Sequence, residues 1–396
     1  MKRYLTAVIA GYMLLFGGSA AGAQTFFGTL GLESAVGVER GSTALVEDVE
    51  HRRFFFTLDT FGSEDVGTVV SSFTVAQPRI LGAHDQLDVS GVVAGPGQDP
   101  TTELRATGVG YRVRPGAGDT TFYFNARYAS VTPDGPLTGS LSIEGDQRQV
   151  AFGARRQTRA REHVVTTMVI EARARQSAAR SFGTRFLDET TKSVFLGIRR
   201  SAGRPFGPQS RLGFAVSAGL AEYGASMPPG VLASAPGADE SFLRYSASAE
   251  GSLPVSSRLA INAGIVGQWT DDSLPVSQRC GFGTNSYSRG FDLSELSADR
   301  CLGGRIELAA NARPGGELGV NWLQAFAGLD GGRLRNLGND LVASSSGVWS
   351  SGSVGLRALG ADWITEISAT KVFRAPSQAI TRDDDARFWV RAAIRF

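Results

Sequence analysis

The sequence holds few of the residues on which most enzyme chemistry depends. Its 396 residues include two cysteines and three histidines. The histidines, His51, His84 and His163, lie far apart without metal-ligand spacing, so we expect no metal site and no cofactor. There is no G-x-S-x-G nucleophile motif and no lysine after a glycine-rich phosphate loop. These absences argue against an enzyme, and a triad assembled from distant strands is the alternative that stays open.

Long apolar runs are missing after the first residues, so the sequence offers no transmembrane helix beyond them. At the start, MKR is followed by the apolar YLTAVIAGYMLLFGG and by an Ala-x-Ala site that ends at Ala23. This order is typical of a secretory signal peptide, and we expect residues 1–23 to be removed. An uncleaved membrane anchor is the alternative. Residues 24–52 then form a short periplasmic or plug segment of an exported protein.

A strong charge of either sign is also absent. The formal net charge is +2, and lysine occurs only at Lys2, Lys192 and Lys371, so arginine supplies nearly all of the positive charge. This balance argues against nucleic acid as a partner and against a polybasic membrane patch. The mean hydropathy of −0.06 is that of a soluble chain. A membrane barrel can have the same mean hydropathy, because in its alternating strands the polar inward residues offset the apolar residues that face lipid.

The last ten residues show such an alternation. One face of a strand carries Phe388, Val390, Ala392, Ile394 and Phe396, and the other carries Arg387, Trp389, Arg391 and Arg395. A strand that is apolar outside and ionic inside suits a transmembrane barrel, because lipid cannot satisfy backbone polar groups and only closed structures span it. A half-buried strand of a soluble sandwich is the alternative.

The same alternation recurs along the chain, clearly at 164–175 and 258–269. Similar segments lie near 53–60, 67–76, 86–94, 101–113, 120–131, 147–158, 190–201, 210–222, 241–251, 302–312, 317–329, 348–359 and 363–374. With the terminal strand they make about 16, each close to the roughly 9 to 11 residues that a tilted membrane strand needs. The sequence therefore predicts an all-β fold, a transmembrane antiparallel β-barrel over residues 53–396. Outer-membrane lipid surrounds it, both chain ends lie on the periplasmic side, and the longer connections are extracellular.

The two cysteines, Cys280 and Cys301, bracket one polar, glycine-rich stretch, GFGTNSYSRGFDLSELSADR. Cys280 ends one strand-like segment and Cys301 begins the next, so an antiparallel hairpin would bring them close enough to bond. The export route is oxidising, which favours a disulfide, with two free thiols as the alternative. A disulfide that closes a loop of this length would restrict the unfolded chain and so stabilise the fold by roughly 3 kcal/mol.

The bracketed stretch resembles a known family. G-F-G-x-N-S-Y-S-R-G-F, then S-A-D-R, then G-G-R-I-E-L is similar to the long sixth loop of the two-partner secretion transporters, the haemolysin activator and secretion proteins. In that family a V-R-G-F/Y tip folds back into the lumen, and S-x-D-R-G and R-x-E-L follow. The matching positions are Arg289, Gly290, Phe291, Asp299, Arg300, Arg305, Glu307 and Leu308. Ser288 replaces the usual valine, and Cys301 replaces the usual glycine.

A second family motif, F-x-G-x-D-x-G, is matched by Phe326, Gly328, Asp330 and Gly332. The resemblance, which covers about residues 53–396, implies a lumen-folded loop between the strands near 257–269 and 302–312. It also implies a contact of the Arg289 guanidinium with Asp330, for which a bidentate ion pair is suited. The terminal Phe396, on the strand that carries Trp389, resembles the C-terminal signature that the barrel assembly machinery binds in outer-membrane barrels.

The resemblance implies a protein of the bacterial outer membrane that translocates or displays a secreted partner polypeptide without enzymatic chemistry. Family members carry periplasmic polypeptide-transport-associated domains, for which residues 24–52 are too few. Either a separate periplasmic capture protein supplies that step, or the barrel has another use. The alternatives are a passive pore or scaffold barrel of an envelope complex, and a barrel subunit bound to a lipoprotein or secreted adhesin.

Overall fold

The computed structural model describes most of the predicted barrel. The described residues are 52–60, 68–95, 103–116, 118–132, 142–161, 163–203, 209–221, 238, 240–283, 287–292, 295–312, 320–338, 343–377, 379 and 381–396. The predicted signal peptide, 1–23, and nearly all of the 24–52 segment lie outside these residues. Their boundaries therefore stay predictions.

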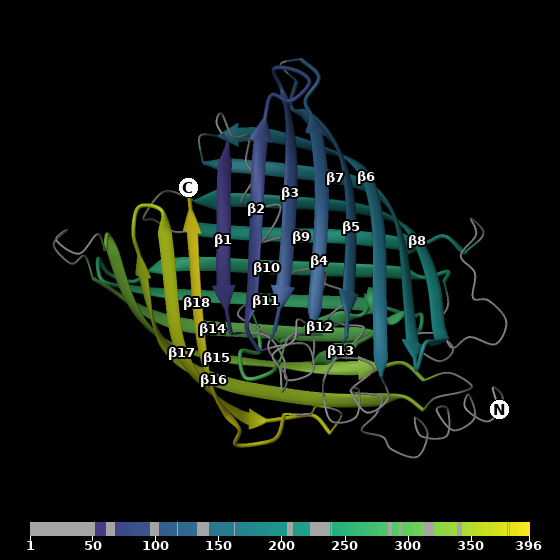
Figure 1. Ribbon diagram of the computed structural model, residues 1–396. Coiled ribbons are helices and arrows are strands. Elements are labelled where there is room, and N and C mark those ends of the chain that lie inside the picture. Colours follow the sequence, from purple (N-terminus) through teal and green to yellow (C-terminus); the bar gives the residue numbers. More distant parts are fainter. Residues whose placement is uncertain are drawn as a thin grey trace.

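Sixteen antiparallel strands close into a barrel (Figure 1). They are β1 (Arg53–Asp59), β2 (Val70–Pro78), β3 (Asp85–Ala94), β4 (Leu104–Val113), β5 (Thr120–Val131), β6 (Ile143–Arg161), β7 (Val164–Ser181), β8 (Thr184–Gly203), β9 (Gln209–Gly219), β10 (Leu243–Pro254), β11 (Leu259–Thr270), β14 (Arg300–Ala312), β15 (Trp322–Asn336), β16 (Ser345–Leu359), β17 (Trp363–Arg374) and β18 (Ala386–Arg395). Each strand overlaps one predicted segment. The predicted fold class is confirmed.

The first and last strands close the ring. The register places Phe55 of β1 opposite Arg395 of β18. Beyond it, the backbone N–H of Phe54 donates to the carbonyl of Phe396 at 3.1 Å, and the N–H of Phe396 donates to the carbonyl of Phe54 at 2.9 Å. Neighbouring strands around the ring pair in the order of the chain, except that β11 pairs directly with β14.

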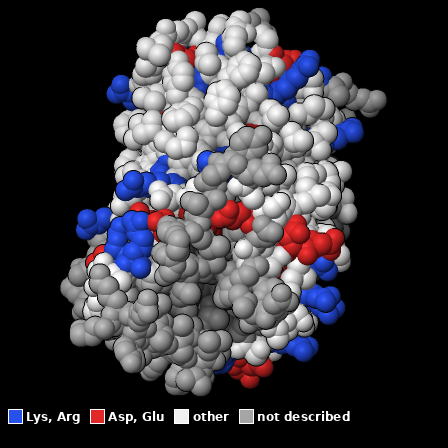
Figure 2. Space-filling model, turned by 90° about the vertical axis from the view of Figure 1, so that its right-hand side faces the viewer, with Lys and Arg blue, Asp and Glu red and all other residues white. Residues whose placement is uncertain are grey.

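The alternation of the sequence decides which side chains face out. In β7, Met168 and Ile170 are 51% and 52% exposed, whereas Glu171 and Arg175 of the other face are buried. Side chains exposed on a barrel of this kind face lipid, so their exposure stabilises the membrane-bound state. Figure 2 shows a broad, mostly uncharged area on one side of the molecule, with charged side chains gathered at its margins.

The longest described excursion from the ring connects β11 to β14. We call residues 271–299 loop 6, because this is the sixth connection on the side of the barrel away from the termini. It contains a 3₁₀ turn, η3 (Val276–Gln278), and a two-stranded sheet of β12 (Cys280–Phe282) and β13 (Leu296–Ala298), which lies within the ring of strands (Figure 1). In the described part of the chain, no helix is long and apolar enough to cross a membrane.

Candidate functional site

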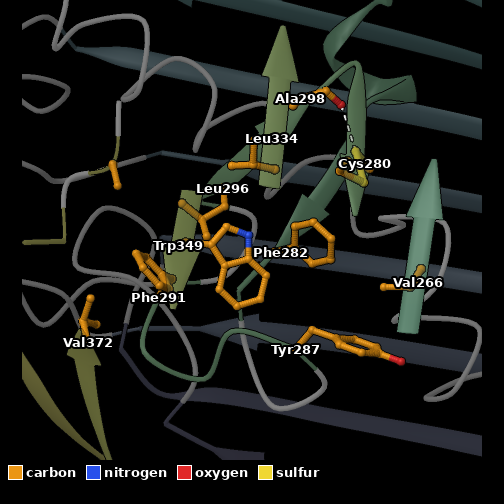
Figure 3. Packing of buried hydrophobic residues seen from close by; sticks show 12 residues of the cluster. Val266, Cys280, Phe282, Tyr287, Phe291, Leu296, Ala298, Leu334, Trp349 and Val372 are labelled. Carbon is orange, nitrogen blue, oxygen red and sulfur yellow. Dashed lines mark hydrogen bonds between the residues drawn. A yellow bond between two sulfur atoms is a disulfide. The ribbon is translucent and has the colours of Figure 1, made fainter. Parts of the chain in front are cut away.

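Loop 6 is packed against the inner wall through aromatic rings. Trp349 of β16 lies between two loop side chains, with ring centroids 5.2 Å from Phe282 and 6.1 Å from Phe291 (Figure 3). Trp349 and Phe291 are fully buried. Gly332 of β15 makes room for the indole, because a Cβ there would lie 2.7 Å from Trp349 Cζ2. The predicted motif glycine thus shapes the wall to accept the loop.

The loop tip approaches the wall so closely that it needs a glycine. A Cβ on Gly290 would lie 2.6 Å from Val372 Cγ2 and 3.0 Å from Ser351 Cβ. Two positions earlier, Ser288 has φ of 59°, in the left-handed region. A β-branched valine adopts that region only at a steric cost, which gives a physical reason for serine at this departure from the family motif.

Arg289 anchors the tip within the wall of β14–β17. The residue is 3% exposed. Its guanidinium donates to Glu307 Oε2 at 3.1 Å and to Ser353 Oγ at 3.0 Å. It also lies 4.9 Å from the ring centroid of Phe326, within cation–π range. Three strands of the wall therefore hold one loop side chain.

The contact of Arg289 with Asp330 differs from the expected one. The backbone N–H of Arg289 donates to the Asp330 carboxylate, while the guanidinium goes to Glu307. Asp330 lies opposite Arg305 in the β14–β15 register. The side chain of Arg289 extends past Asp330 to a second carboxylate, that of Glu307. The expected pair of the Arg289 guanidinium with Asp330 is therefore wrong, although the backbone of Arg289 does contact Asp330.

A wall arginine, Arg357 of β16, binds the same acid. Its Nη1 and Nη2 donate to Glu307 Oε1 and Oε2 at 2.7 and 2.8 Å, and its Nε donates to Glu366 of β17 at 2.7 Å. The guanidinium stacks 4.0 Å from the centroid of Phe326. Sequence reasoning missed Arg357, Glu366 and Ser353. The available signal was the polar face of the alternating segments at 348–359 and 363–374.

Asp299 ties the two limbs of loop 6 together at its base. This fully buried carboxylate accepts hydrogen bonds from the backbone N–H of Leu274 and from Arg279 Nε, both at 3.0 Å, and from the N–H of Leu337 at 2.8 Å. The neighbouring Arg300 pairs with Asp271 and lies 4.0 Å from the centroid of the Trp269 ring. Both motif residues therefore hold the base of the loop and not its tip.

The remaining motif residues divide between lumen and lipid. Arg305 lies 5.3 Å from the centroid of the Tyr287 ring of the loop, and Gly328 lies opposite Glu307 in the register. Leu308 is 51% exposed on the other face of β14. The structure thus brings Arg289, Glu307, Phe326 and Asp330 to one place and puts Leu308 outside it.

The predicted disulfide between Cys280 and Cys301 is present, with the two Cα atoms 6.4 Å apart. Cys280, however, lies in β12 within loop 6, and the wall strand β11 has already ended at Thr270. The expectation that Cys280 ends a strand-like segment is therefore wrong, because Cys280 is the first residue of β12. The bond joins the small inner sheet to β14, so it holds the loop itself against the wall.

A further set of contacts joins loop 6 to the connection between β17 and β18. Glu295 accepts hydrogen bonds from the backbone N–H and Oγ1 of Thr381, at 2.6 and 2.7 Å. Asp292, three residues from Arg289, forms an ion pair with Arg387 of β18. Sequence reasoning assigned none of these residues to the loop site, because the partners are separated by about ninety positions and no local pattern links them.

The two residues of the predicted C-terminal signal lie on opposite faces of β18. Trp389 is buried on the inner face, with Arg387 5.9 Å from its ring centroid, and Phe396 is exposed at the end of the strand. Their part in assembly stays a prediction. Among the described residues, no group of three or more His, Cys, Asp or Glu side chains is placed to hold a metal ion.

The family model of the haemolysin secretion/activation proteins ShlB/FhaC/HecB matches residues 42–358. The chain belongs to this family. Membership confirms the resemblance carried by the loop and strand motifs. Together with the closed barrel, it places this ShlB/FhaC/HecB family member in the bacterial outer membrane.

The fold of this family member is similar to that of three solved structures. CdiB from Escherichia coli matches with a TM-score of 0.72 at 18% identity, over 89% of this chain and 64% of that one. CdiB from Acinetobacter baumannii matches at 0.67 and 16%, over 88% and 60%. BamA from Haemophilus ducreyi lacking POTRA domains 1–3 matches at 0.60 and 11%, over 88% and 71%. The chain thus spans less than two thirds of either CdiB chain. No curated protein sequence matches it.

Proposed function

We propose that this outer-membrane barrel translocates or displays a secreted partner polypeptide across the outer membrane, without catalysis or a cofactor. The observation that carries the proposal is loop 6, which occupies the lumen but is not part of the barrel sheet. Its tip is held by side-chain contacts that can be exchanged, above all Arg289 with Glu307 and Ser353. A polypeptide pathway needs a plug of this kind, which closes the lumen at rest and can move aside.

The wall is arranged so that the plug can leave. Glu307 and Glu366 both bind Arg357, so neither carboxylate loses its last cation when Arg289 departs. An uncompensated buried charge would cost several kcal/mol, and the wall arginine avoids that cost. Folding of the partner outside the cell supplies the direction of movement. The barrel assembly machinery inserts the barrel.

A comparison of surface and released proteins tests the proposal. Cells with and without the barrel are compared by mass spectrometry, and the wild-type gene and an Arg289→Gln variant are each returned to the deletion strain. Loss of one large polypeptide, with its precursor held in the periplasm and release restored by the wild type, is the expected result. An unchanged protein profile in the deletion strain overturns the proposal and favours the passive pore or scaffold.

A further inference from the structure

The outer surface of the barrel carries three arginines close together, at the end of the barrel from which loop 6 leaves. They are Arg300 at the start of β14, and Arg333 and Arg335 near the end of β15. Arg300 and Arg335 lie directly opposite each other in the β14–β15 register. Arg333 is two residues from Arg335 on the same strand and therefore shares its face. We call these three side chains the outer arginine cluster.

The arginines of β15 face lipid and not the lumen. Leu334, which lies between them in the sequence, is fully buried on the inner face, whereas Arg333 and Arg335 are exposed. The register neighbours of Arg333 are Leu302 and Val348, which are 53% and 40% exposed on the lipid-facing side. Since side chains alternate between the two faces of a strand, both arginines project from the outer surface.

The third member of the cluster, Arg300, is held in place by residues at the end of β11. Its Nε donates to the carbonyl of Thr270 at 2.5 Å, and its Nη2 pairs with Asp271. Its guanidinium lies 4.0 Å from the centroid of the Trp269 ring, and Trp269 is 55% exposed on the lipid-facing side. Arg300 is therefore fixed in position, and Asp271 offsets its charge.

The two arginines of β15 leave the cluster with a positive charge. The register neighbours of Arg335 are Arg300 and Ser346, and those of Arg333 are apolar, so no carboxylate lies directly across from either. Like charges that lie opposite each other on neighbouring strands destabilise a sheet. An anion bound between Arg300 and Arg335 would relieve that repulsion. The exposed Ser346 adds a hydroxyl beside Arg335.

The cluster lies at one edge of the apolar band. Leu302 is level with Arg333, and Ile306, 53% exposed, continues the same apolar face toward the other end of β14. At that other end, the outward residues of β14 and β15 are the uncharged Ala312 and Leu323, which lie opposite each other. Loop 6 leaves the barrel on the side away from the termini, so in the predicted orientation the cluster lies at the outer leaflet.

We propose that the outer arginine cluster binds the phosphorylated headgroup of a lipid in the outer leaflet, with the acyl chains of that lipid against the apolar band. A guanidinium presents a planar fork that matches phosphate oxygens, and it keeps its charge at every pH that a cell meets. Cations at a membrane surface attract anionic headgroups, and the aliphatic side chains below them suit acyl chains. The site does not depend on whether a polypeptide passes through the lumen.

Lipid binding to the full-length barrel, purified in detergent and measured by native mass spectrometry, tests the proposal. The probe is lipid A, an acylated and phosphorylated disaccharide, and its match is the same lipid without phosphates. The wild type should bind lipid A about tenfold more tightly than the phosphate-free lipid. The Arg333→Gln/Arg335→Gln variant should bind lipid A about tenfold more weakly than the wild type, because two partly exposed ion pairs are lost.

The other end of the barrel supplies a matched control. Arg156 of β6 and Arg200 of β8 are exposed, and both lie near the strand ends away from loop 6. Their register neighbours are Met168 and Leu212, which are 51% and 54% exposed on the lipid-facing side. The Arg156→Gln/Arg200→Gln variant removes the same charge from the outer surface but leaves the cluster intact. It should bind lipid A as the wild type does.

Equal binding of lipid A and the phosphate-free lipid, or equal loss in the two double variants, overturns the proposal. Inorganic phosphate serves as a competitor. If it displaces lipid A at an equal concentration, the cluster is a site for a free anion and the lipid proposal fails. Folding is checked by the heat-dependent shift in gel migration. If the double variant of the cluster does not fold, Arg335→Gln against Arg200→Gln decides, because each removes one exposed arginine.

Discussion

Arg289 of loop 6 and Arg357 of the wall bind one carboxylate, that of Glu307. The wall arginine makes two hydrogen bonds to it at 2.7 and 2.8 Å, and the loop arginine approaches a single oxygen at 3.1 Å. Arg357 therefore holds the acid in the geometry that is strongest for an arginine–carboxylate pair, and Arg289 takes the weaker position. The loop tip is bound and yet replaceable.

Replacing Arg289 by glutamine should loosen the tip of loop 6. The variant loses charge-assisted hydrogen bonds to Glu307 and the stacking on Phe326, which together contribute about 2 kcal/mol to docking of the loop. Protease cleavage within loop 6 and the conductance of the barrel in lipid bilayers should both rise. Arg300→Gln at the loop base is the control. Unchanged conductance and cleavage in Arg289→Gln would contradict a tether at this position.

Replacing Arg357 by glutamine should have the opposite effect on the loop. Glu307 and Glu366 then lose their wall arginine, and Arg289 becomes the cation nearest to both, at 3.1 and 4.0 Å. Release of the loop would expose unpaired acids, so opening should become rarer. A double-mutant cycle with Arg289→Gln measures the coupling. Equal effects of Arg289→Gln with and without Arg357 would show that the two arginines act independently.

The fold was predictable because a barrel strand repeats one simple pattern. In β7, for example, the exposed Met168 and Ile170 alternate with Glu171 and Arg173 of the inner face. The strand ends were less predictable. β6, β7 and β8 run on well beyond the predicted segments, because polar outward residues such as Arg180 and Asp188 continue the sheet without the apolar signal.

The site was only partly predictable, for a reason that Arg357 illustrates. The family motifs named the loop arginine and two strand acids, but the charge that Glu307 pairs with most closely comes from fifty residues further along the chain. Nothing in the local pattern at Arg357 distinguishes it from other inward arginines. The strand register, which the sequence does not specify, decides that Gln324, Arg357 and Glu366 lie side by side.

Alanine at Gly290 should displace the tip without any change of charge. Its Cβ would lie 2.6 Å from Val372 Cγ2 and 3.0 Å from Ser351 Cβ, closer than packed atoms allow, so the tip must withdraw from the wall. Loop 6 should become as accessible to protease as in Arg289→Gln. Gly304→Ala, whose Cβ would have its nearest contact at 3.4 Å, is the control on β14. If loop 6 of the Gly290→Ala variant is cleaved no faster than that of the wild type, the close approach of the tip to the wall is not needed to dock the loop.

Removing the disulfide should destabilise the barrel while leaving the loop tip docked. The bond joins residues 21 positions apart and restricts the unfolded chain. Its removal should lower the free energy of unfolding by roughly 3 kcal/mol. Cys280→Ser/Cys301→Ser, like the wild type with reductant, should therefore unfold at a lower temperature in the gel-shift assay. Arg289 and Gly290 still hold the tip, so protease cleavage of loop 6 should rise little. Combined with Arg289→Gln, the serine variant should be cleaved in loop 6 more than either variant alone, because the inner sheet and the tip have then both lost a contact with the wall. A serine variant whose unfolding temperature responds to reductant, or a wild type that does not respond, would show that the bond does not carry this stability.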